Sequence, residues 1–175
     1  MVRLHLYSLV KWMSKIIEMK TAIFPGSFDP FTLGHLDVLQ SALMLFDKIV
    51  IAVGNNVQKK GFFSIEDRID IIKSATKNMG NVEVCSYTGL TIDFCKHMDI
   101  KFIIRGLRTT TDFELERVVA QANAKMSPDI LTVFIPSGHE YSFISSTVVR
   151  DVLLNGGDAS SFMPSGIEIS KYSKN

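Results

Sequence analysis

The chain has 175 residues, 46% of them apolar and 21% charged, which is the composition of a globular domain. Lysine and arginine total 19 against 18 acidic residues, so the net charge of +1 gives no general attraction to nucleic acid or to an anionic membrane. The two cysteines, Cys85 and Cys95, fit neither a disulfide framework nor a zinc motif. We expect them to be small core residues of a protein in a reducing compartment, the cytoplasm.

Residues 1–18 differ from the rest of the chain, because apolar residues at helical spacing are interrupted there by Lys11 and Lys15. A secretory signal would not carry Lys11 in its apolar part, and the segment is too short and too charged to span a bilayer. An amphipathic surface helix is one interpretation. We prefer a start at Met19, directly before the first strand. The chain is therefore divided into an N-terminal extension, 1–18, and a single domain, 19–175.

From residue 19 onward, short apolar runs alternate with longer stretches of helical periodicity. Strands are expected at 21–24, 49–53, 82–86, 102–104 and 131–135. Helices are expected at 34–46, 64–75, 91–98, 112–125 and 145–154, with a short turn or helix near 160–162. This alternation predicts an α/β fold with a doubly wound, five-stranded parallel sheet of the Rossmann-like type. Such sheets bind ligands at the carboxyl ends of their strands, where the strand order reverses.

The connection between the first strand and the first helix, residues 24–35, is the most informative segment. Gly26 permits a sharp turn, and Ser27 offers a hydroxyl and an amide to an oxyanion. Gly34 and His35 fall at the helix start, where free amides and the helix dipole favour phosphate and the neutral imidazole. His35 alone would pass as an ordinary helix-start residue. The segment contains neither the GxGxxG motif of dinucleotide-binding proteins nor the P-loop motif GxxxxGK[ST], so it does not support either of these two modes of nucleotide binding.

Three further segments bring anion-binding groups to the same edge of the predicted sheet. Arg105 and Arg108, separated by Gly and Leu, follow the fourth strand and suit phosphate oxygens. Residues 140–147 carry hydroxyls to the start of the last helix, and Lys59 follows the second strand. Each segment alone is also explained as a surface charge or an ordinary helix cap. Their convergence on one edge favours a phosphate-bearing ligand.

The turn Thr32-Leu33-Gly34-His35 resembles the His/Thr-x-Gly-His signature of the nucleotidyltransferase superfamily. Three more stretches, IRGLR at 104–108, DFE at 112–114 and SFISST at 142–147, make the chain similar to the phosphopantetheine adenylyltransferase family over about nine tenths of its length. The resemblance implies a Rossmann-like nucleotidyltransferase fold. It also implies transfer of AMP from ATP to 4'-phosphopantetheine, giving dephospho-coenzyme A and pyrophosphate in one in-line displacement without a covalent enzyme intermediate.

The same resemblance assigns roles to residues of this chain. The catalytic residues it implies are His35, Lys59 and Arg105. The substrate-binding residues it implies are Ser27, Lys59, Thr91 and Arg105. The ATP-binding residues it implies are Ser27, Phe28, His35, Gly106, Leu107, Arg108, Glu116, Tyr141, Ser142, Phe143, Ile144, Ser145, Ser146 and Thr147. Magnesium (Mg2+) is expected with ATP, without a protein metal site. The resemblance also implies a homohexamer, the usual assembly of this family.

Two other functions remain open at this point. The first is another small-molecule nucleotidyltransferase, with nicotinate mononucleotide or glycerol phosphate as the acceptor. The second is a nucleotide-binding module without catalysis, which the presence of His35 and Lys59 disfavours. A flavodoxin-like electron carrier would need a Ser/Thr-rich phosphate loop after the first strand, and residues 25–30 do not provide one.

Overall fold

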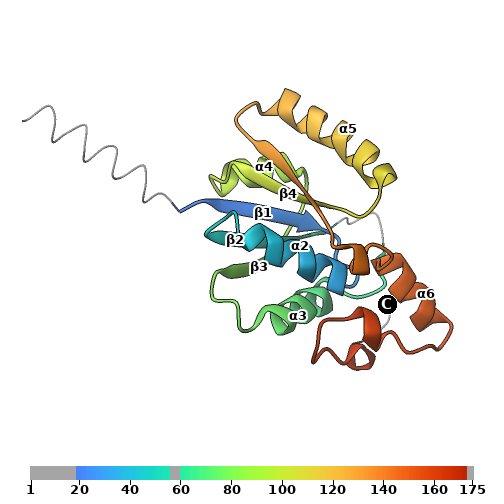
Figure 1. Ribbon diagram of the computed structural model, residues 1–175. Helices are drawn as coiled ribbons and strands as arrows, with labels where there is room; N and C mark the ends of the chain where they lie inside the picture. The colour runs from blue at the N-terminus through green and yellow to red at the C-terminus, as the bar shows by residue number, and fades with distance from the viewer. Residues whose placement is uncertain (1–18, 56–59, 173–175) are drawn as a thin grey trace, which may run out of the picture.

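The computed structural model describes residues 19–55 and 60–172, and its centre is a five-stranded parallel sheet (Figure 1). The strands are β1 (Thr21–Gly26), β2 (Lys48–Gly54), β3 (Val82–Tyr87), β4 (Phe102–Leu107) and β5 (Leu131–Pro136). Their order in the sheet is β3-β2-β1-β4-β5. The predicted α/β class with a parallel sheet is confirmed.

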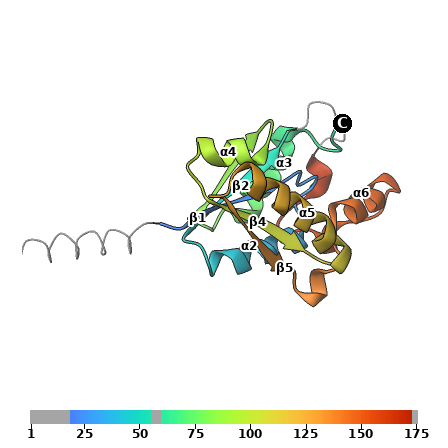
Figure 2. The ribbon, with the colours of Figure 1, turned by 90° about the horizontal axis from the view of Figure 1, so that it is seen from above.

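Helices cover both faces of the sheet. The α-helices are α2 (Leu33–Leu43), α3 (Ile65–Thr76), α4 (Thr91–His97), α5 (Thr110–Met126) and α6 (Ser146–Leu154), with 3-10 turns η1 (His139–Tyr141), η2 (Ser160–Phe162) and η3 (Ile169–Lys171). Alternate residues of β1 point to opposite faces, so Phe24 packs with α2 and α3 in one core cluster and Ile23 packs with α4 in another. Figures 1 and 2 show α2 and α4 on opposite sides of the sheet.

The strand order reverses between β1 and β4, which are hydrogen-bonded neighbours although two strands separate them in sequence. All strands point the same way, and α6 with the C-terminal segment lies beyond their carboxyl ends (Figure 1). A crevice between β1 and β4 at this end is where a doubly wound sheet binds its ligand. None of the helices in the described part of the chain is long and apolar enough to cross a membrane.

Three element boundaries differ from the sequence expectation, each because of tertiary pairing. β1 continues through Pro25 and Gly26, which lie in register with β2. β4 continues to Leu107 because it pairs with β5 to that point, so Arg105 lies within the strand and not after it. α2 ends at Leu43, short of Phe46, which turns inward to pack its ring 5.3 Å from that of Phe102.

Candidate active site

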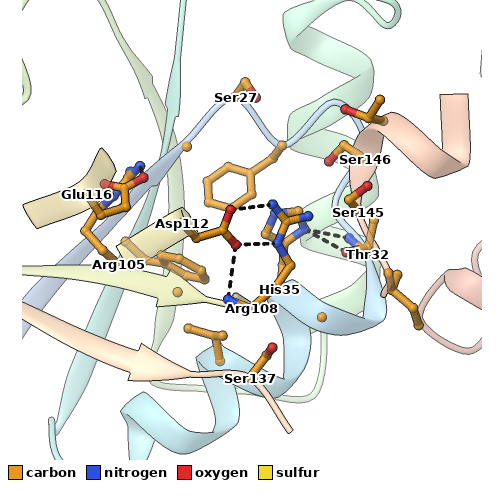
Figure 3. Close-up of a pocket in the computed structure, with 18 of the residues that line it drawn as sticks. Ser27, Thr32, His35, Arg105, Arg108, Asp112, Glu116, Ser137, Ser145 and Ser146 are labelled. Atoms are coloured by element: carbon orange, nitrogen blue, oxygen red, sulfur yellow. Dashed lines mark hydrogen bonds and ion pairs between the residues drawn. The ribbon is translucent and has the colours of Figure 1, made fainter. Parts of the chain in front are cut away.

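A cavity of about 320 Å³ opens at the carboxyl ends of β1 and β4 (Figure 3). This volume falls within the range of small-molecule sites. Its walls come from the β1–α2 connection, the end of β4, α5 and the start of α6. The lining residues are Phe24, Pro25, Gly26, Ser27, Phe28, Thr32, Gly34, His35, Val38, Arg105, Gly106, Arg108, Asp112, Glu116, Ser137, Ile144, Ser145, Ser146, Thr147 and Arg150.

His35 is the third residue of α2, and a capping box fixes its ring. The backbone amide of Thr32 donates to His35 Nδ1 at 3.0 Å, and the Thr32 hydroxyl lies 2.9 Å from the same nitrogen. Because Nδ1 accepts a hydrogen bond from an amide, the proton of the neutral ring is on Nε2. His35 therefore presents an N–H donor on the nitrogen that does not bond to the cap.

Two buried phenyl rings, which also contact each other, pack against the imidazole. The Phe31 ring is stacked on it at 5.4 Å between centroids, and the Phe28 ring meets it edge-on at 5.2 Å. Burial, followed by the positive charges of Arg108 and Arg105, lowers the pKa of His35 from 6.5 to about 4. The neutral ring expected from the helix dipole is thus explained mainly by burial. Above about pH 5 the side chain is an uncharged hydrogen-bond donor.

This lowered pKa predicts a loss of stability in acid. Between pH 6.5 and about 4 the unfolded chain binds a proton at His35 that the folded protein does not, so the free energy of unfolding falls as the pH is lowered through that window. At about 1.4 kcal/mol per pKa unit, the upper bound is about 3 kcal/mol. Urea unfolding at several pH values should show this slope, and the His35→Asn variant should lack it. An identical slope in both proteins would contradict the assignment.

The turn after β1 brings Phe28 over the site. Phe28 has φ 45°, in the left-handed region that non-glycine residues seldom occupy, and strain of this kind is common at ligand sites. Its ring folds back over Gly26, where a Cβ atom would lie 2.8 Å from Phe28 Cζ. Gly26 is therefore required by close approach, and the two residues together shape the wall behind His35.

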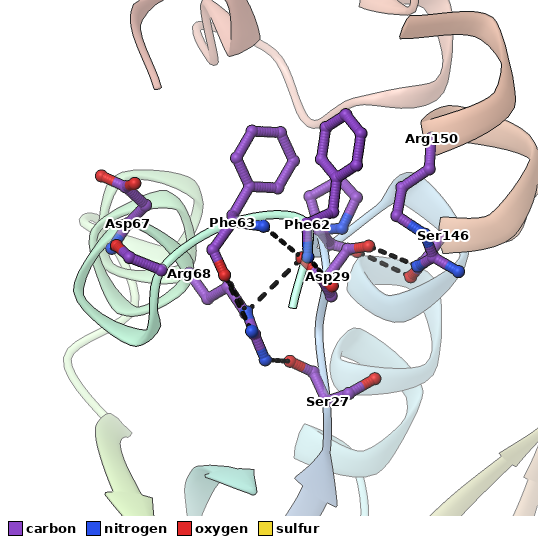
Figure 4. Close-up of polar contacts among 10 residues, drawn as sticks. Ser27, Asp29, Phe62, Phe63, Asp67, Arg68, Ser146 and Arg150 are labelled. Atoms are coloured by element: carbon purple, nitrogen blue, oxygen red, sulfur yellow. Dashed lines mark hydrogen bonds and ion pairs between the residues drawn. The ribbon is translucent and has the colours of Figure 1, made fainter. Parts of the chain in front are cut away.

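A buried ion pair supports this turn from below (Figure 4). Asp29 accepts hydrogen bonds from the amides of Phe62 and Phe63 at 2.8 and 2.9 Å, and its Oδ1 lies 3.4 Å from Arg68 Nε. Arg68 donates to the carbonyls of Phe63 and Ser27. Both charged side chains are buried. The network thus ties the segment that precedes α3 to the β1–α2 turn.

Two arginines reach the cavity, Arg105 from β4 and Arg108 from the position directly after it, and each has a carboxylate partner on α5. Arg105 makes a bidentate pair with Glu116, with Nε at 2.7 Å from Oε2, and its Nη1 donates to the Pro25 carbonyl at 2.9 Å. Arg108 makes two side-chain hydrogen bonds to Asp112. The carboxylates hold both guanidinium groups in place, and Figure 3 shows the Arg108–Asp112 pair beside His35 and the Arg105–Glu116 pair on the other side of Asp112.

The start of α6 forms the opposite wall. Ser145 caps the helix by accepting from the Val148 amide at 3.1 Å, and the Ser146 hydroxyl donates to the Pro30 carbonyl at 2.8 Å. Arg150 donates to the Asp29 carbonyl at 2.6 Å and to the Thr147 hydroxyl at 3.2 Å. The starts of α6 and α2 therefore both contribute residues to one cavity, and the amides of a helix start suit a polyphosphate.

Most of the residues predicted for the site line this cavity. Those brought together are Ser27, Phe28, His35, Arg105, Gly106, Arg108, Glu116, Ile144, Ser145, Ser146 and Thr147. Thr91 is not in the lining, and its hydroxyl hydrogen-bonds to that of Tyr87 at 2.7 Å. Leu107, Tyr141, Ser142 and Phe143 do not line it either. Lys59 lies outside the described residues.

The sequence analysis missed several residues of the cavity, among them Asp112, Ser137 and Arg150. Asp112 was quoted as part of a motif without a role, and its position four residues after Arg108 is the spacing of a helical ion pair. Arg150 lies one helical turn after Thr147, which would have placed it on the same face of the predicted helix. Nothing local distinguishes Ser137, because its burial depends on the neighbouring strand and helix.

A parallel sheet with a cavity at its switch point, two helix starts and two arginines defines an α/β nucleotidyltransferase-like protein. The profile of the cytidylyltransferase-like family matches residues 23–152. Solved structures agree on the fold. A nicotinate-nucleotide adenylyltransferase described as putative, from Vibrio parahaemolyticus, superposes with a TM-score of 0.65 and 20% identity, over 87% of this chain and 90% of its own.

The curated relatives narrow the class. The protein called phosphopantetheine adenylyltransferase in Flavobacterium psychrophilum is 50% identical over 151 residues, which cover 86% of this chain and 99% of the relative. The protein of the same name in Lachnoclostridium phytofermentans is 46% identical over 85% of this chain and 91% of its own length. The chain belongs to the phosphopantetheine adenylyltransferase family within the cytidylyltransferase-like proteins.

Proposed function

We propose that this protein transfers the adenylyl group of ATP to 4'-phosphopantetheine, releasing pyrophosphate and forming dephospho-coenzyme A. The observation that carries the proposal is the Nε2–H of His35, held beside Arg105 and Arg108 in a cavity between two helix starts. Family membership supports the choice of acceptor. Nicotinate mononucleotide and glycerol phosphate, left open by the sequence, are less well supported, because the curated relatives at 46–50% identity share one name.

The reaction proposed is a single in-line displacement at the α-phosphorus. An oxygen of the acceptor's phosphate forms the new P–O bond while the bond to the leaving pyrophosphate breaks. A phosphate monoester is largely a dianion at pH 7, so it needs no general base. Charge must instead be stabilised on the transferring group, and the neutral His35 ring does this by donating Nε2–H to an α-phosphate oxygen.

The ATP phosphates are proposed to lie against the start of α6. There Ser145, Ser146, Thr147 and Arg150 line the cavity. The acceptor's phosphate is proposed to lie between Arg105 and Lys59, the latter taken from the family resemblance. Arg105 is held on Glu116 and on the Pro25 carbonyl, so its guanidinium is oriented before the acceptor arrives.

Replacing Arg105 by methionine should therefore raise KM for 4'-phosphopantetheine by about 10- to 100-fold, the usual worth of a hydrogen bond to a charged group. ATP affinity should change less than about threefold. Initial rates at varied acceptor, together with calorimetric ATP titration, check both values. Arg117→Met, which removes an exposed arginine paired with Glu114 on α5, is the matched control. A loss confined to ATP binding would assign Arg105 to the nucleotide instead.

Magnesium is proposed to enter as the Mg–ATP complex. No group of three or more His, Cys, Asp or Glu side chains in the described part of the chain is arranged to hold a metal ion. The two carboxylates of the cavity, Asp112 and Glu116, are each bonded to an arginine. Phosphate oxygens and water are therefore the ligands proposed for the ion, in keeping with how Mg2+ binds to nucleotides.

A homohexamer and a cytoplasmic location are also proposed. Helix α5 has no buried residue, although it carries several large apolar side chains. Leu115, Val118 and Val119 on it are 67%, 59% and 50% exposed. An unpartnered apolar helix face of this kind is typical of an interface between subunits. The cysteine content, two cysteines without a disulfide pattern, supports a cytoplasmic enzyme.

Pyrophosphate release tests the function directly. The protein with Mg–ATP is assayed with 4'-phosphopantetheine, with nicotinate mononucleotide, with glycerol phosphate and without an acceptor. We expect release with phosphopantetheine alone. Release with another acceptor only would retain the chemistry and overturn the proposed substrate. Folded protein that binds ATP and releases no pyrophosphate with any acceptor would favour the binding module.

A further inference from the structure

Asp37 is a carboxylate of α2 that the proposed reaction does not use. It lies two residues after His35, and its Oδ2 accepts a hydrogen bond from the backbone amide of Gly138 at 2.7 Å. The two residues are 101 positions apart in the chain, and Gly138 belongs to the β5–α6 connection, residues 137–145. A short hydrogen bond to an ionised acceptor is among the stronger kinds. It therefore fixes the beginning of the connection on α2.

Short backbone hydrogen bonds join this fixed point to the start of α6. The Gly138 carbonyl accepts from the Tyr141 amide at 3.0 Å, and the Tyr141 carbonyl accepts from the Ile144 amide at 2.9 Å. Ile144 is followed directly by Ser145, the residue that caps α6. Because each of these bonds spans only three residues, the place where Gly138 is held determines where α6 begins.

Helix α2 also contacts the far end of the β5–α6 connection, at Gly34. A Cβ atom on Gly34 would lie 3.4 Å from the Ile144 carbonyl oxygen and 3.5 Å from that of Tyr141, so the first turn of α2 lies directly against the backbone of the connection. Gly34 thus provides a close fit, and Asp37 provides a hydrogen bond. Both come from the helix that carries His35, one residue before it and two residues after it.

We propose that Asp37 is a positioning residue, which holds Gly138 and thereby sets the start of α6 at the distance from His35 that the ATP phosphates require. The proposal rests on the proposed function in placing these phosphates between the two helix starts. Since the bond is present in the free protein, this wall of the cavity is formed before the nucleotide arrives. Without the bond, the ligand itself must order the connection, and binding is weakened by that cost.

Calorimetry with two ligands, Mg–ATP and inorganic tripolyphosphate with Mg2+, tests the proposal. Asp37→Ala should weaken both about three- to tenfold, less than the full worth of a hydrogen bond to a charged group, because the contacts of Gly34 and Ser146 remain. Asp37→Asn, whose amide oxygen can still accept from Gly138, should bind both within about twofold of the wild type. Gln40→Ala, at an exposed position on the same helix, is the matched control and should change neither affinity.

Hydrogen exchange at the Gly138 amide, followed by NMR without ligand, reports on the bond itself. This amide should exchange at least about tenfold more slowly in the wild type than in Asp37→Ala, with Asp37→Asn between the two. If the wild-type amide exchanges as fast as in an unstructured peptide, the proposal is wrong, and that result needs no variant to fold.

The affinities can overturn the proposal in two further ways. Asp37→Ala could bind both ligands as tightly as the wild type, or Asp37→Asn could bind them as weakly as Asp37→Ala, and either result would mean that the bond to Gly138 does not position the phosphate site. These measurements use no acceptor. A protein that binds ATP and releases no pyrophosphate would therefore contradict the proposed function and leave the role of Asp37 intact.

Discussion

Replacing His35 by asparagine should lower kcat by about 10²- to 10³-fold, the usual cost of losing one preorganised donor to a developing oxyanion. The asparagine amide oxygen can still accept from the Thr32 amide, where His35 Nδ1 does so at 3.0 Å, and the cap of α2 is retained. Only the donor at Nε2 is lost. Since this donor acts mainly on charge that develops in the transition state, ATP affinity should change less than about threefold.

Single-turnover pyrophosphate release and ATP titration separate the two effects. His97→Ala serves as the matched control, since His97 lies exposed at the end of α4 and away from the cavity. A parallel fall in ATP affinity and kcat would mean that His35 binds the ground state as strongly as the transition state. A kcat within about threefold of the wild type would remove His35 from the mechanism altogether.

Replacing Arg68 by methionine should lower the free energy of unfolding by about 3–5 kcal/mol, because it leaves the buried Asp29 carboxylate without its counter-charge. The carbonyls of Phe63 and Ser27 also lose their donor. Chemical unfolding at pH 7 measures the loss. The surviving folded protein should bind ATP more weakly, since Ser27 and Phe28 are no longer held in position.

Lys73→Met on the same helix, at an exposed position, should cost less than about 0.5 kcal/mol. Arg68→Lys keeps the positive charge but lacks the several N–H donors of the guanidinium group. Its loss of unfolding free energy should lie between those of Arg68→Met and Lys73→Met. In a double-mutant cycle with Asp29→Asn, the combined loss should be smaller than the sum of the single losses by 1 kcal/mol or more, within the usual range for contacting residues of about 0.5–3 kcal/mol. Strict additivity would show that the ion pair is not the source of the stability.

Much of the fold followed from local pattern. Apolar periodicity placed five strands and the intervening helices within a few residues of their observed ends, because each element must turn its apolar side chains toward a core. The order of elements then required a parallel sheet. The segment before His35 could be recognised for a similar reason, since the turn, the helix start and the histidine are adjacent in sequence.

The details of the site depended on tertiary structure, because its decisive contacts join residues far apart in the chain. No local pattern pairs Asp29 with Arg68 or carries Arg150 to the Asp29 carbonyl. The tertiary structure also separates Thr91 from the other residues predicted for the site. Thr91 bonds to Tyr87 on the outer strand β3 and does not line the cavity.

The sequence by itself determined the secondary structure, the parallel sheet and the turn that carries His35, all of which are fixed by periodicity and short-range geometry. The tertiary structure decided which groups are charged, paired or free. The low pKa of His35 comes first from burial, and the buried hydroxyl of Ser137 has no hydrogen-bond partner among the residues that the structure describes. Both depend on the dielectric environment that neighbouring segments create, which has no counterpart in a linear pattern.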